Sequence, residues 1–325
     1  MASFTRTDIS IPSAMPGWAL DAWLYAPQHQ GDRALPVIVM AHGWSCTKRM
    51  GLSVYAEIFA ARGYAVVVFD YRRWGASDGT PRHILLPAEQ VEDFRTVIKW
   101  ARQQPQFDAQ RVVVWGTSFG GGHAITIASD LATNPAAAIA QCPYTGTIPT
   151  VHPLSLLKTT ALGFLDVGLG AFNATLGLVD VGLGLLGFGL GFLRVPALGP
   201  LYMPAAGPPG SCAGLTTPSA EAGIRARQGE DSDWVNEINA SCLLSTLFYK
   251  PRAAAAQITC PTLVLAPTED EECPVAGARA VAGAGETVEL VEFAGAAHFE
   301  IYPFEKHYEA ALQAQIDFLA RHVPV

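Results

Sequence analysis

The pattern Gly-x-Ser-x-Gly, which can raise a serine hydroxyl on a sharp turn, occurs twice in this chain, at residues 75–79 and 116–120. Such a serine acts as a nucleophile when a buried strand runs straight into it and a helix starts straight after it. Ser118, in the second copy, meets both conditions, because apolar residues 112–115 lead into it and a glycine-rich helical segment follows. We therefore predict that Ser118 is the nucleophile of a covalent acyl-transfer reaction.

The first copy of the pattern contains Ser77 and fits this context poorly. Residues 71–74 separate it from the preceding apolar run, and Thr80-Pro81 follows at the point where a helix would have to start. We interpret this copy as a polar turn without a catalytic role.

A serine hydroxyl is a weak nucleophile until a neighbouring imidazole takes its proton. Of the eight histidines, His298 is best placed, because it ends a loop that follows the alternating segment 288–293. Catalytic groups of a parallel sheet lie in such loops, and serine, acid, histidine is a known chain order for a triad. His42, in the loop after the strand expected at 35–41, is the rival, and we interpret it as a structural histidine.

The acid of the triad must lie between the serine and the histidine in the chain. One loop there carries four consecutive carboxylates, residues 269–272. We predict that Asp270 is the acid, because it lies four residues before Pro274, which is tolerated in the first turn of a helix. Glu269 and Glu271 remain alternatives, and we expect the carboxylates that are not the acid to be solvated and without a catalytic role.

Backbone amides are expected to hold the negative charge that develops on the substrate oxygen. We assign this oxyanion hole to the N–H groups of Trp44 and Phe119, which follow an expected strand and the nucleophile. Trp44 and Tyr144, each just after a core strand, are candidates for lining the substrate pocket. The cysteines have no metal-ligand spacing, so we expect no metal and no organic cofactor.

These residues require a scaffold of alternating strands and helices. Alternation of this kind predicts a mostly parallel sheet with helices on both faces, which is an α/β fold. Strands are expected at 4–11, 18–25, 35–41, 65–70, 111–116, 138–142, 262–267 and 288–293, and helices at 52–62, 88–104, 119–132, 275–282 and 304–322.

The alternation stops between residues 150 and 255, which we interpret as a cap inserted into a core formed by 1–149 and 256–325. Residues 162–193 are almost entirely Gly, Leu, Val, Phe and Ala, and a polar helix is expected over 220–247. A membrane span needs about 20 uninterrupted apolar residues, and Asp180 interrupts this run. We therefore favour an apolar cap over a membrane-touching hairpin or a true span, while a homodimer through this surface stays open.

Composition narrows the classes of partner. The 325-residue chain has a formal net charge of −8 and a pI of about 5.5, without a cluster of Lys or Arg. This charge argues against nucleic acid or an anionic membrane surface as the main partner. The six scattered cysteines indicate free thiols in a reducing compartment, and the N-terminus lacks the apolar segment of a signal peptide. We therefore expect a cytoplasmic protein.

With these elements in place, the chain resembles the α/β-hydrolase superfamily over roughly residues 15–145 and 255–322. The resemblance implies the α/β-hydrolase fold and a Ser118, Asp270, His298 triad, without specifying the substrate. It rests on AHGW at 41–44, FDYRRWGASDG at 69–79, WGTSFGG at 115–121, PTLVLAPTEDEECP at 261–274 and GAAHFEIY at 295–302.

Within the superfamily, the combination is similar to dienelactone-hydrolase-like and dipeptidyl-peptidase-like bacterial hydrolases. It also resembles fungal polyketide transferases and thiohydrolases of secondary metabolism, through AHFEIY and through GPPGSCAGLTTPSAE at 207–221. The glycine- and leucine-rich run at 162–193 departs from both groups.

The predicted function is hydrolysis of an ester or thioester of a small, hydrophobic acyl substrate through an acyl-enzyme. One alternative is an acyltransferase that moves a polyketide or acyl chain to an alcohol or amine, and another is a non-catalytic binding protein with the same fold. A lyase that uses the same triad is a further alternative. Dehalogenases and epoxide hydrolases of this fold are disfavoured, because their nucleophile is Asp whereas residue 118 is Ser.

Overall fold

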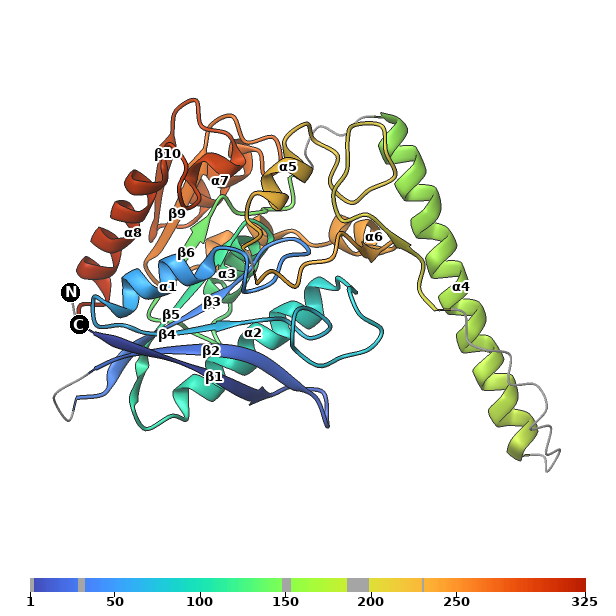
Figure 1. The fold of residues 1–325 in the computed structure, drawn as a ribbon, viewed down its shortest axis with the longest axis horizontal. Helices are drawn as coiled ribbons and strands as arrows, with labels where there is room; N and C mark the ends of the chain where they lie inside the picture. Colours follow the sequence, from blue (N-terminus) through green and yellow to red (C-terminus); the bar gives the residue numbers. More distant parts are fainter. Residues whose placement is uncertain (1–2, 29–32, 148–152, 186–198, 230) are drawn as a thin grey trace.

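The computed structural model describes residues 3–28, 33–147, 153–185, 199–229 and 231–325 of the chain (Figure 1). Strands and helices alternate in the first and last parts of the chain, as the sequence predicts. In chain order the elements are β1 (Phe4–Pro12), β2 (Ala19–Pro27), β3 (Leu35–Ala41), α1 (Leu52–Ala60), β4 (Ala65–Phe69), α2 (Pro87–Arg102), β5 (Phe107–Thr117), α3 (Phe119–Ala128), β6 (Ala137–Gln141), α4 (Pro153–Leu185), β7 (Tyr202–Met203), α5 (Ala220–Arg225), β8 (Ile238–Asn239), α6 (Cys242–Leu247), β9 (Thr262–Pro267), α7 (Val275–Ala284), β10 (Val288–Phe293) and α8 (Tyr308–His322).

The main sheet has eight strands in the order β1-β2-β4-β3-β5-β6-β9-β10. The strands from β4 to β10 pair in parallel, whereas β1 and β2 form an antiparallel edge. Parallel strands direct their carboxyl ends to the same edge of the sheet, so the loops after β3, β5, β9 and β10 lie along one edge. The predicted mostly parallel α/β fold is confirmed.

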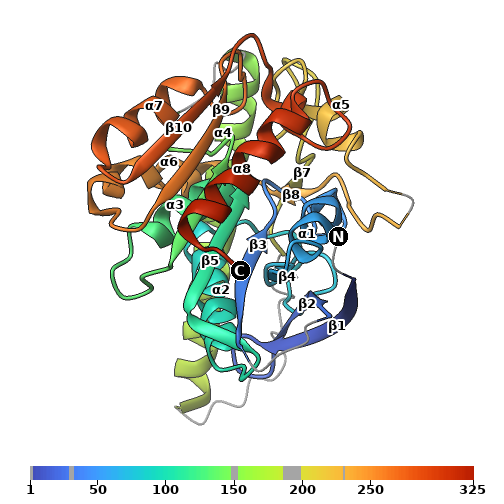
Figure 2. The same ribbon diagram turned by 90° about the vertical axis from the view of Figure 1, so that its left-hand side faces the viewer.

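The core consists of two apolar layers, one on each face of the sheet. In β3, Val37 and Val39 belong to one layer and Ile38 and Met40 to the other, because successive side chains of a strand point to opposite faces. Helices α2, α3 and α7 pack on the first face, and α1 and α8 pack on the second (Figure 2). This burial on both faces explains why the central strands are continuous apolar runs.

The segment between β6 and β9 contributes no strand to the main sheet over its described residues. It contains α4, the short β7–β8 pair and the two six-residue helices α5 and α6. The polar helix expected over 220–247 is therefore wrong as a single element. Gly229 and the run Asp231-Ser232-Asp233 lie between α5 and α6, and these residue types favour turns over helix.

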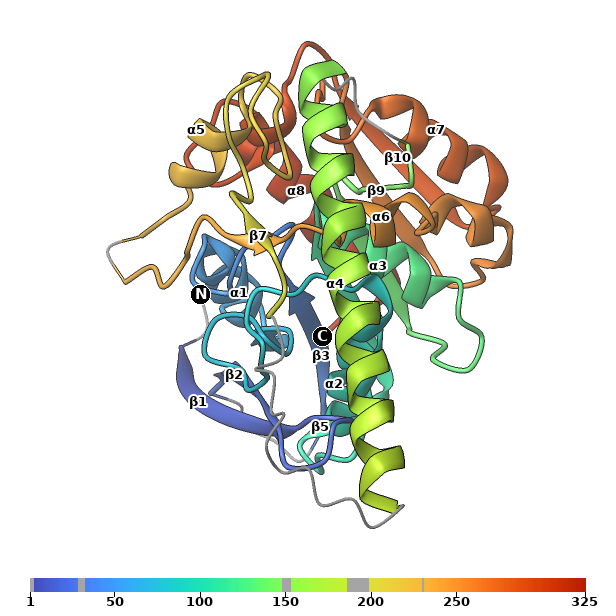
Figure 3. The same ribbon diagram turned by 90° about the vertical axis from the view of Figure 1, so that its right-hand side faces the viewer.

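Helix α4 is a single 33-residue helix that runs along one side of the molecule, with its C-terminal end beyond the body (Figures 1 and 3). Its residues Pro153–Ala174 are long and apolar enough to cross a membrane by length and composition, and 22% of an 18-residue window within this stretch is buried. Asp166 is an acidic residue in this apolar helix. Its carboxylate is buried and accepts hydrogen bonds from the amides of Leu201 (2.8 Å) and Ser241 (3.1 Å). The carboxylate therefore fastens α4 to two loops of the same segment.

Candidate active site

Ser118, Asp270 and His298 meet at the carboxyl edge of the sheet, where β5, β9 and β10 end. His298 Nε2 lies 3.2 Å from Ser118 Oγ, and His298 Nδ1 lies 2.7 Å from Asp270 Oδ2. The imidazole thus lies between the hydroxyl and the carboxylate, with one ring nitrogen within hydrogen-bonding distance of each. This arrangement lets the histidine take a proton from the serine while the carboxylate orients the ring.

Ser118 lies on a sharp turn between β5 and α3. Its φ of 55° is in the left-handed region, which only a strained connection imposes on a serine. Glycines make the turn possible: a Cβ at Gly116 would lie 2.0 Å from Gly120 O, and a Cβ at Gly120 would lie 2.3 Å from His42 O. The strand and the helix therefore approach more closely than any side chain would permit.

Asp270 is the member of the acidic loop that reaches the imidazole. Its other oxygen, Oδ1, accepts hydrogen bonds from the amides of Glu272 (2.9 Å) and Cys273 (2.6 Å). Glu269 and Glu271 are exposed. The alternation of exposed and buried residues along the loop therefore places Asp270, and neither of these neighbours, against His298.

The electrostatic surroundings of His298 favour its protonated form. Burial by itself would lower the pKa of the ring, but the adjacent Asp270 carboxylate raises the pKa well above the usual 6.5. Both side chains are almost completely buried, so water screens the attraction little. A strongly basic imidazole suits a group that must hold a proton during the reaction.

The sequence assigns the oxyanion hole to the backbone amides of Trp44 and Phe119. Among the described residues, the N–H groups of Trp44 and Phe119 donate to no other protein atom. A Cβ at Gly43 would lie 3.0 Å from the Cβ of Ser118, so the loop with Trp44 passes directly beside the nucleophile. These amides are therefore free to bind a substrate oxygen.

A cavity of about 160 Å³ lies above Ser118 and His298. Trp44 and Tyr144, the two lining residues that the sequence suggests, both lie in its wall. Trp44 packs edge-on against Phe119 with 5.6 Å between ring centroids. The remaining wall comes largely from the segment between β6 and β9 and is mostly apolar, including Leu156, Ala213, Leu215, Ile224, Leu243, Leu244 and Leu247.

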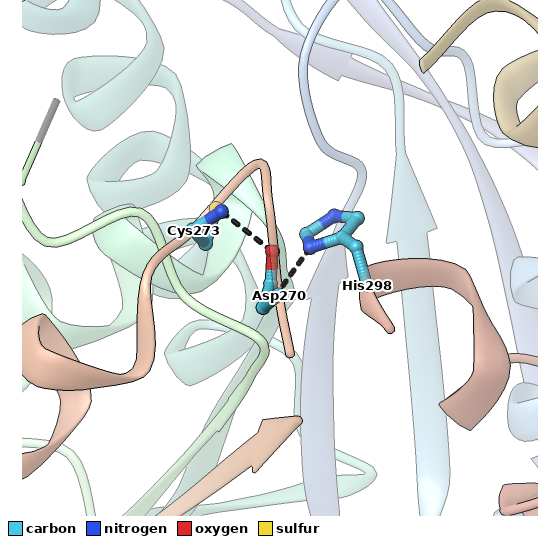
Figure 4. Close-up of side chains that lie close together, drawn as sticks. All are labelled: Asp270, Cys273 and His298. Atoms are coloured by element: carbon cyan, nitrogen blue, oxygen red, sulfur yellow. Dashed lines mark hydrogen bonds and ion pairs between the residues drawn. The ribbon is translucent and has the colours of Figure 1, made fainter. Parts of the chain in front are cut away.

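Asp270, Cys273 and His298 also offer three potential metal-ligand atoms within 4.8 Å of one another (Figure 4). The chemistry of the group does not fit a metal site. Burial and the nearby Asp270 raise the pKa of the Cys273 thiol well above its usual 9.0, and a protonated thiol is a poor metal ligand. Asp270 is already fully engaged with His298 and with two amides. All six cysteines are free thiols.

Ser77 and His42 are the alternatives to Ser118 and His298, and their side chains make contacts that are typical of structural residues. Ser77 Oγ donates to Asp70 O (2.6 Å) and accepts from the amide of Asp21 (2.8 Å). His42 Nδ1 lies 3.0 Å from Gly43 O, and burial lowers the pKa of its ring. Both residues hold loops that support the site.

The sequence motifs and their spacing do not reveal every residue of the site. Glu272, which we expected to be solvated, is only 5% exposed and lines the cavity, so that expectation is wrong. Arg227 and Phe299 also line the cavity, and the guanidinium of Arg227 lies 5.3 Å from the ring centroid of Phe299. Nothing in the local sequence marks these residues, because distant segments create their environment.

Comparison with known proteins gives the following similarities. The family model of the X-Pro dipeptidyl-peptidases (S15 family) matches residues 17–152. The chain is 36% identical over 311 residues to the quorum-quenching protein AidA of Acinetobacter baumannii, a match that covers 94% of this chain and 91% of that protein. It is 32% identical over 166 residues to the polyketide transferase ATR5 of Stachybotrys chlorohalonatus, covering 51% of this chain and 53% of that one.

Among solved structures, the α/β hydrolase GrgF from Penicillium sp. sh18 matches with a TM-score of 0.75 at 24% sequence identity. The match covers 99% of this chain and 100% of that chain. At this identity, the likeness shows that the two proteins share a fold.

Proposed function

Because the chain belongs to the α/β-hydrolase family, we propose that it is a serine hydrolase that cleaves an ester or thioester of a hydrophobic acyl substrate. The observation that carries this proposal is the hydrogen-bonded row Ser118, His298, Asp270 on the floor of an apolar cavity. The free amides of Trp44 and Phe119 beside Ser118 supply the remaining element that acyl transfer requires.

In the acylation step, His298 Nε2 removes the proton of Ser118 as Oγ attacks the substrate carbonyl. The carbonyl oxygen becomes an oxyanion, which the amides of Trp44 and Phe119 stabilise. His298 then gives its proton to the leaving alkoxide or thiolate, and the bond between the acyl carbon and the leaving group breaks. Asp270 holds the ring in the correct tautomer and stabilises the imidazolium.

In the deacylation step, a water molecule takes the place of the leaving group. His298 removes a proton from this water, the resulting hydroxide attacks the acyl carbon, and the proton returns to Ser118 Oγ as the acid leaves. Together, the two steps use Ser118, His298, Asp270, the two backbone amides and one water molecule.

The lining of the cavity supports a hydrophobic acyl group. Leucines of the segment between β6 and β9, with Ala213 and Ile224, form much of its wall, which removes apolar surface of a bound chain from water. Ionisable side chains are few there: besides the histidines His42 and His298, the described lining includes one arginine, Arg227, and one carboxyl group, Glu272. Binding of a highly charged substrate is therefore disfavoured.

The test is acid release from matched acyl esters, acyl thioesters and acyl lactones of increasing chain length. Lactones belong in this panel because a ring ester opens by the same chemistry. We expect Ser118→Ala to abolish turnover, whereas Ser10→Ala, at an exposed strand position, should leave it unchanged. Full activity in Ser118→Ala would reject the proposed nucleophile.

A second candidate is acyl transfer to an alcohol or amine. The support for it is the similarity to a polyketide transferase and the apolar wall of the cavity. An added alcohol or amine would then divert the product from acid to ester or amide. Ligand binding by the wild type without any turnover or transfer would instead favour a non-catalytic binding protein.

A further inference from the structure

The wall of the cavity contains a second buried carboxyl group beside the proposed triad. Glu272 is two residues after Asp270, and its amide donates to Asp270 Oδ1 at 2.9 Å. Its side chain lines the same cavity as Ser118 and His298 and is only 5% exposed. The backbone that holds the triad acid therefore also fixes the position of Glu272.

The two oxygens of this carboxyl group have different surroundings. Oε1 accepts a hydrogen bond from the hydroxyl of Thr217, which comes from the segment between β6 and β9. Oε2 is buried and has no hydrogen-bond partner among the described residues. Leaving a buried polar atom unpaired destabilises the protein, so its retention in a cavity needs a reason.

The surroundings of Glu272 shift its carboxyl group toward the neutral form. Burial raises the pKa of the carboxyl group, and the nearby charges of Asp270 and Glu271 act in the same direction, against His298 and the Thr217 hydroxyl. In the neutral acid, one oxygen accepts from Thr217 and the other carries a proton. That O–H group then has no acceptor within the described protein.

We propose that Glu272 donates a hydrogen bond to an acceptor oxygen of the substrate, so that the cavity selects acyl compounds with an ether, hydroxyl or carbonyl oxygen near the reacting bond. This assignment rests on the proposed function and deepens it, because it names the substrate class of the same site. Arg227, which also lines the cavity, has its Nη2 engaged by Phe299 O (2.7 Å) and Glu305 (3.1 Å), whereas its Nε and the Nε2 of His42 are further buried atoms without a hydrogen-bond partner among the described residues.

A purely structural role makes a different prediction. If Glu272 only joins the Thr217 loop to the acid loop, its removal should weaken turnover of all substrates alike. A substrate-binding role requires that the effect depend on an oxygen in the substrate. The difference between two isosteric substrates therefore separates these roles.

The experiment compares pairs of substrates in which one methylene group is replaced by oxygen. On the acyl side, octanoyl esters are compared with 3-oxaoctanoyl esters, and on the leaving-group side, butyl octanoate is compared with 2-methoxyethyl octanoate. The readout is kcat/KM for the oxygen-containing substrate divided by kcat/KM for its methylene counterpart. When this ratio is compared between variants, differences in the intrinsic reactivity of the two substrates cancel. The two pairs also reveal on which side of the reacting bond the oxygen is bound.

Glu272→Leu and Glu272→Met, which lack a donor, should lower this ratio about five- to tenfold for one pair, as expected for one lost hydrogen bond. Glu272→Gln retains an N–H donor and should keep most of the preference. Glu271→Leu, at the exposed neighbouring position, is the matched control and should leave the ratio unchanged. Two apolar variants are used so that poor folding of one does not decide the result.

Binding of the same intact esters to Ser118→Ala, alone and combined with Glu272→Leu, separates this inference from the proposed function. Absence of turnover in the wild type would reject the proposed function, while an oxygen preference in binding that depends on Glu272 would still support this inference. Equal ratios in all variants, or an equal loss for both members of each pair, would overturn it. Absence of any oxygen-dependent binding would overturn it as well.

Discussion

His298 Nδ1 lies 2.7 Å from Asp270 Oδ2, and both side chains are buried at the ends of the adjacent strands β10 and β9. The loops after these strands are joined directly, since the amide of Glu269 donates to Ala296 O at 2.9 Å. The pair is therefore held by the sheet itself, which makes the orientation of the imidazole a property of the fold.

Asp270→Asn should lower kcat by about 10³- to 10⁴-fold, because an amide donor in place of the carboxylate favours the wrong tautomer of His298. Glu271→Gln, which changes an exposed carboxylate in the same loop, is the control and should retain activity. Steady-state kinetics on the best ester of the panel measures both. Comparable activity of Asp270→Asn and Glu271→Gln would mean that Asp270 is not the acid.

The pH dependence of kcat/KM should report the pKa of His298. Catalysis needs the neutral imidazole, so activity should be lost as pH falls through this pKa. Because Asp270 raises the pKa above 6.5, we expect the acid limb of the wild type at a pH above 6.5. In Asp270→Asn the remaining burial lowers the pKa, and the limb of the residual activity should move to lower pH. A limb below 6.5 in the wild type would contradict this electrostatic account.

Ser77→Ala should destabilise the protein without removing its chemistry. The substitution leaves Asp70 O and the amide of Asp21 without their buried partner, which should cost about 1–3 kcal/mol of unfolding free energy. Urea unfolding with Ser10→Ala as control measures the loss, and kcat of the folded variant should stay near the wild-type value. Complete loss of kcat in folded Ser77→Ala would give the first Gly-x-Ser-x-Gly copy a role that we do not assign to it.

Lys48→Met should be among the more destabilising single substitutions. The ammonium of Lys48 is buried and contacts Asp70 (2.9 Å) and Asp21, so its removal leaves the buried Asp70 carboxylate unpaired. Breaking such a pair costs about 3–5 kcal/mol. Lys99→Met, on the exposed face of α2, is the matched control, and thermal unfolding compares the two. Equal melting temperatures would show that the network contributes little.

The outer face of α4 should drive self-association. Phe164 is 64% exposed and Phe172 is 53% exposed, together with several leucines of the same helix, and a monomer rarely leaves so large an apolar patch in water. Sedimentation analysis of the wild type should show concentration-dependent association that Phe164→Glu/Phe172→Glu weakens. A monomer at all concentrations that instead sediments with lipid vesicles would assign this face to a membrane surface.

The local sequence is informative where short-range patterns dictate structure. Alternation with a period of two, apolar runs and the glycines around Ser118 predict the strands, the sheet and the elbow, because backbone geometry depends on neighbouring residues. The order of the chain also indicates His298. The catalytic roles of these residues remain predictions, although the structure brings their side chains together.

The sequence favours Asp270 among the four acidic residues at 269–272 but leaves Glu269 and Glu271 open, and the tertiary structure separates all four. Their identities are nearly equivalent in sequence, but the loop turns Asp270 toward His298, exposes Glu269 and Glu271, and buries Glu272 against Thr217, 55 residues away. Burial depends on contacts between segments that are distant in the chain, and the chemistry of a carboxyl group depends on its burial. The sequence by itself therefore determined the fold and the candidate nucleophile, whereas tertiary packing decided which acidic residue faces His298 and which faces the cavity.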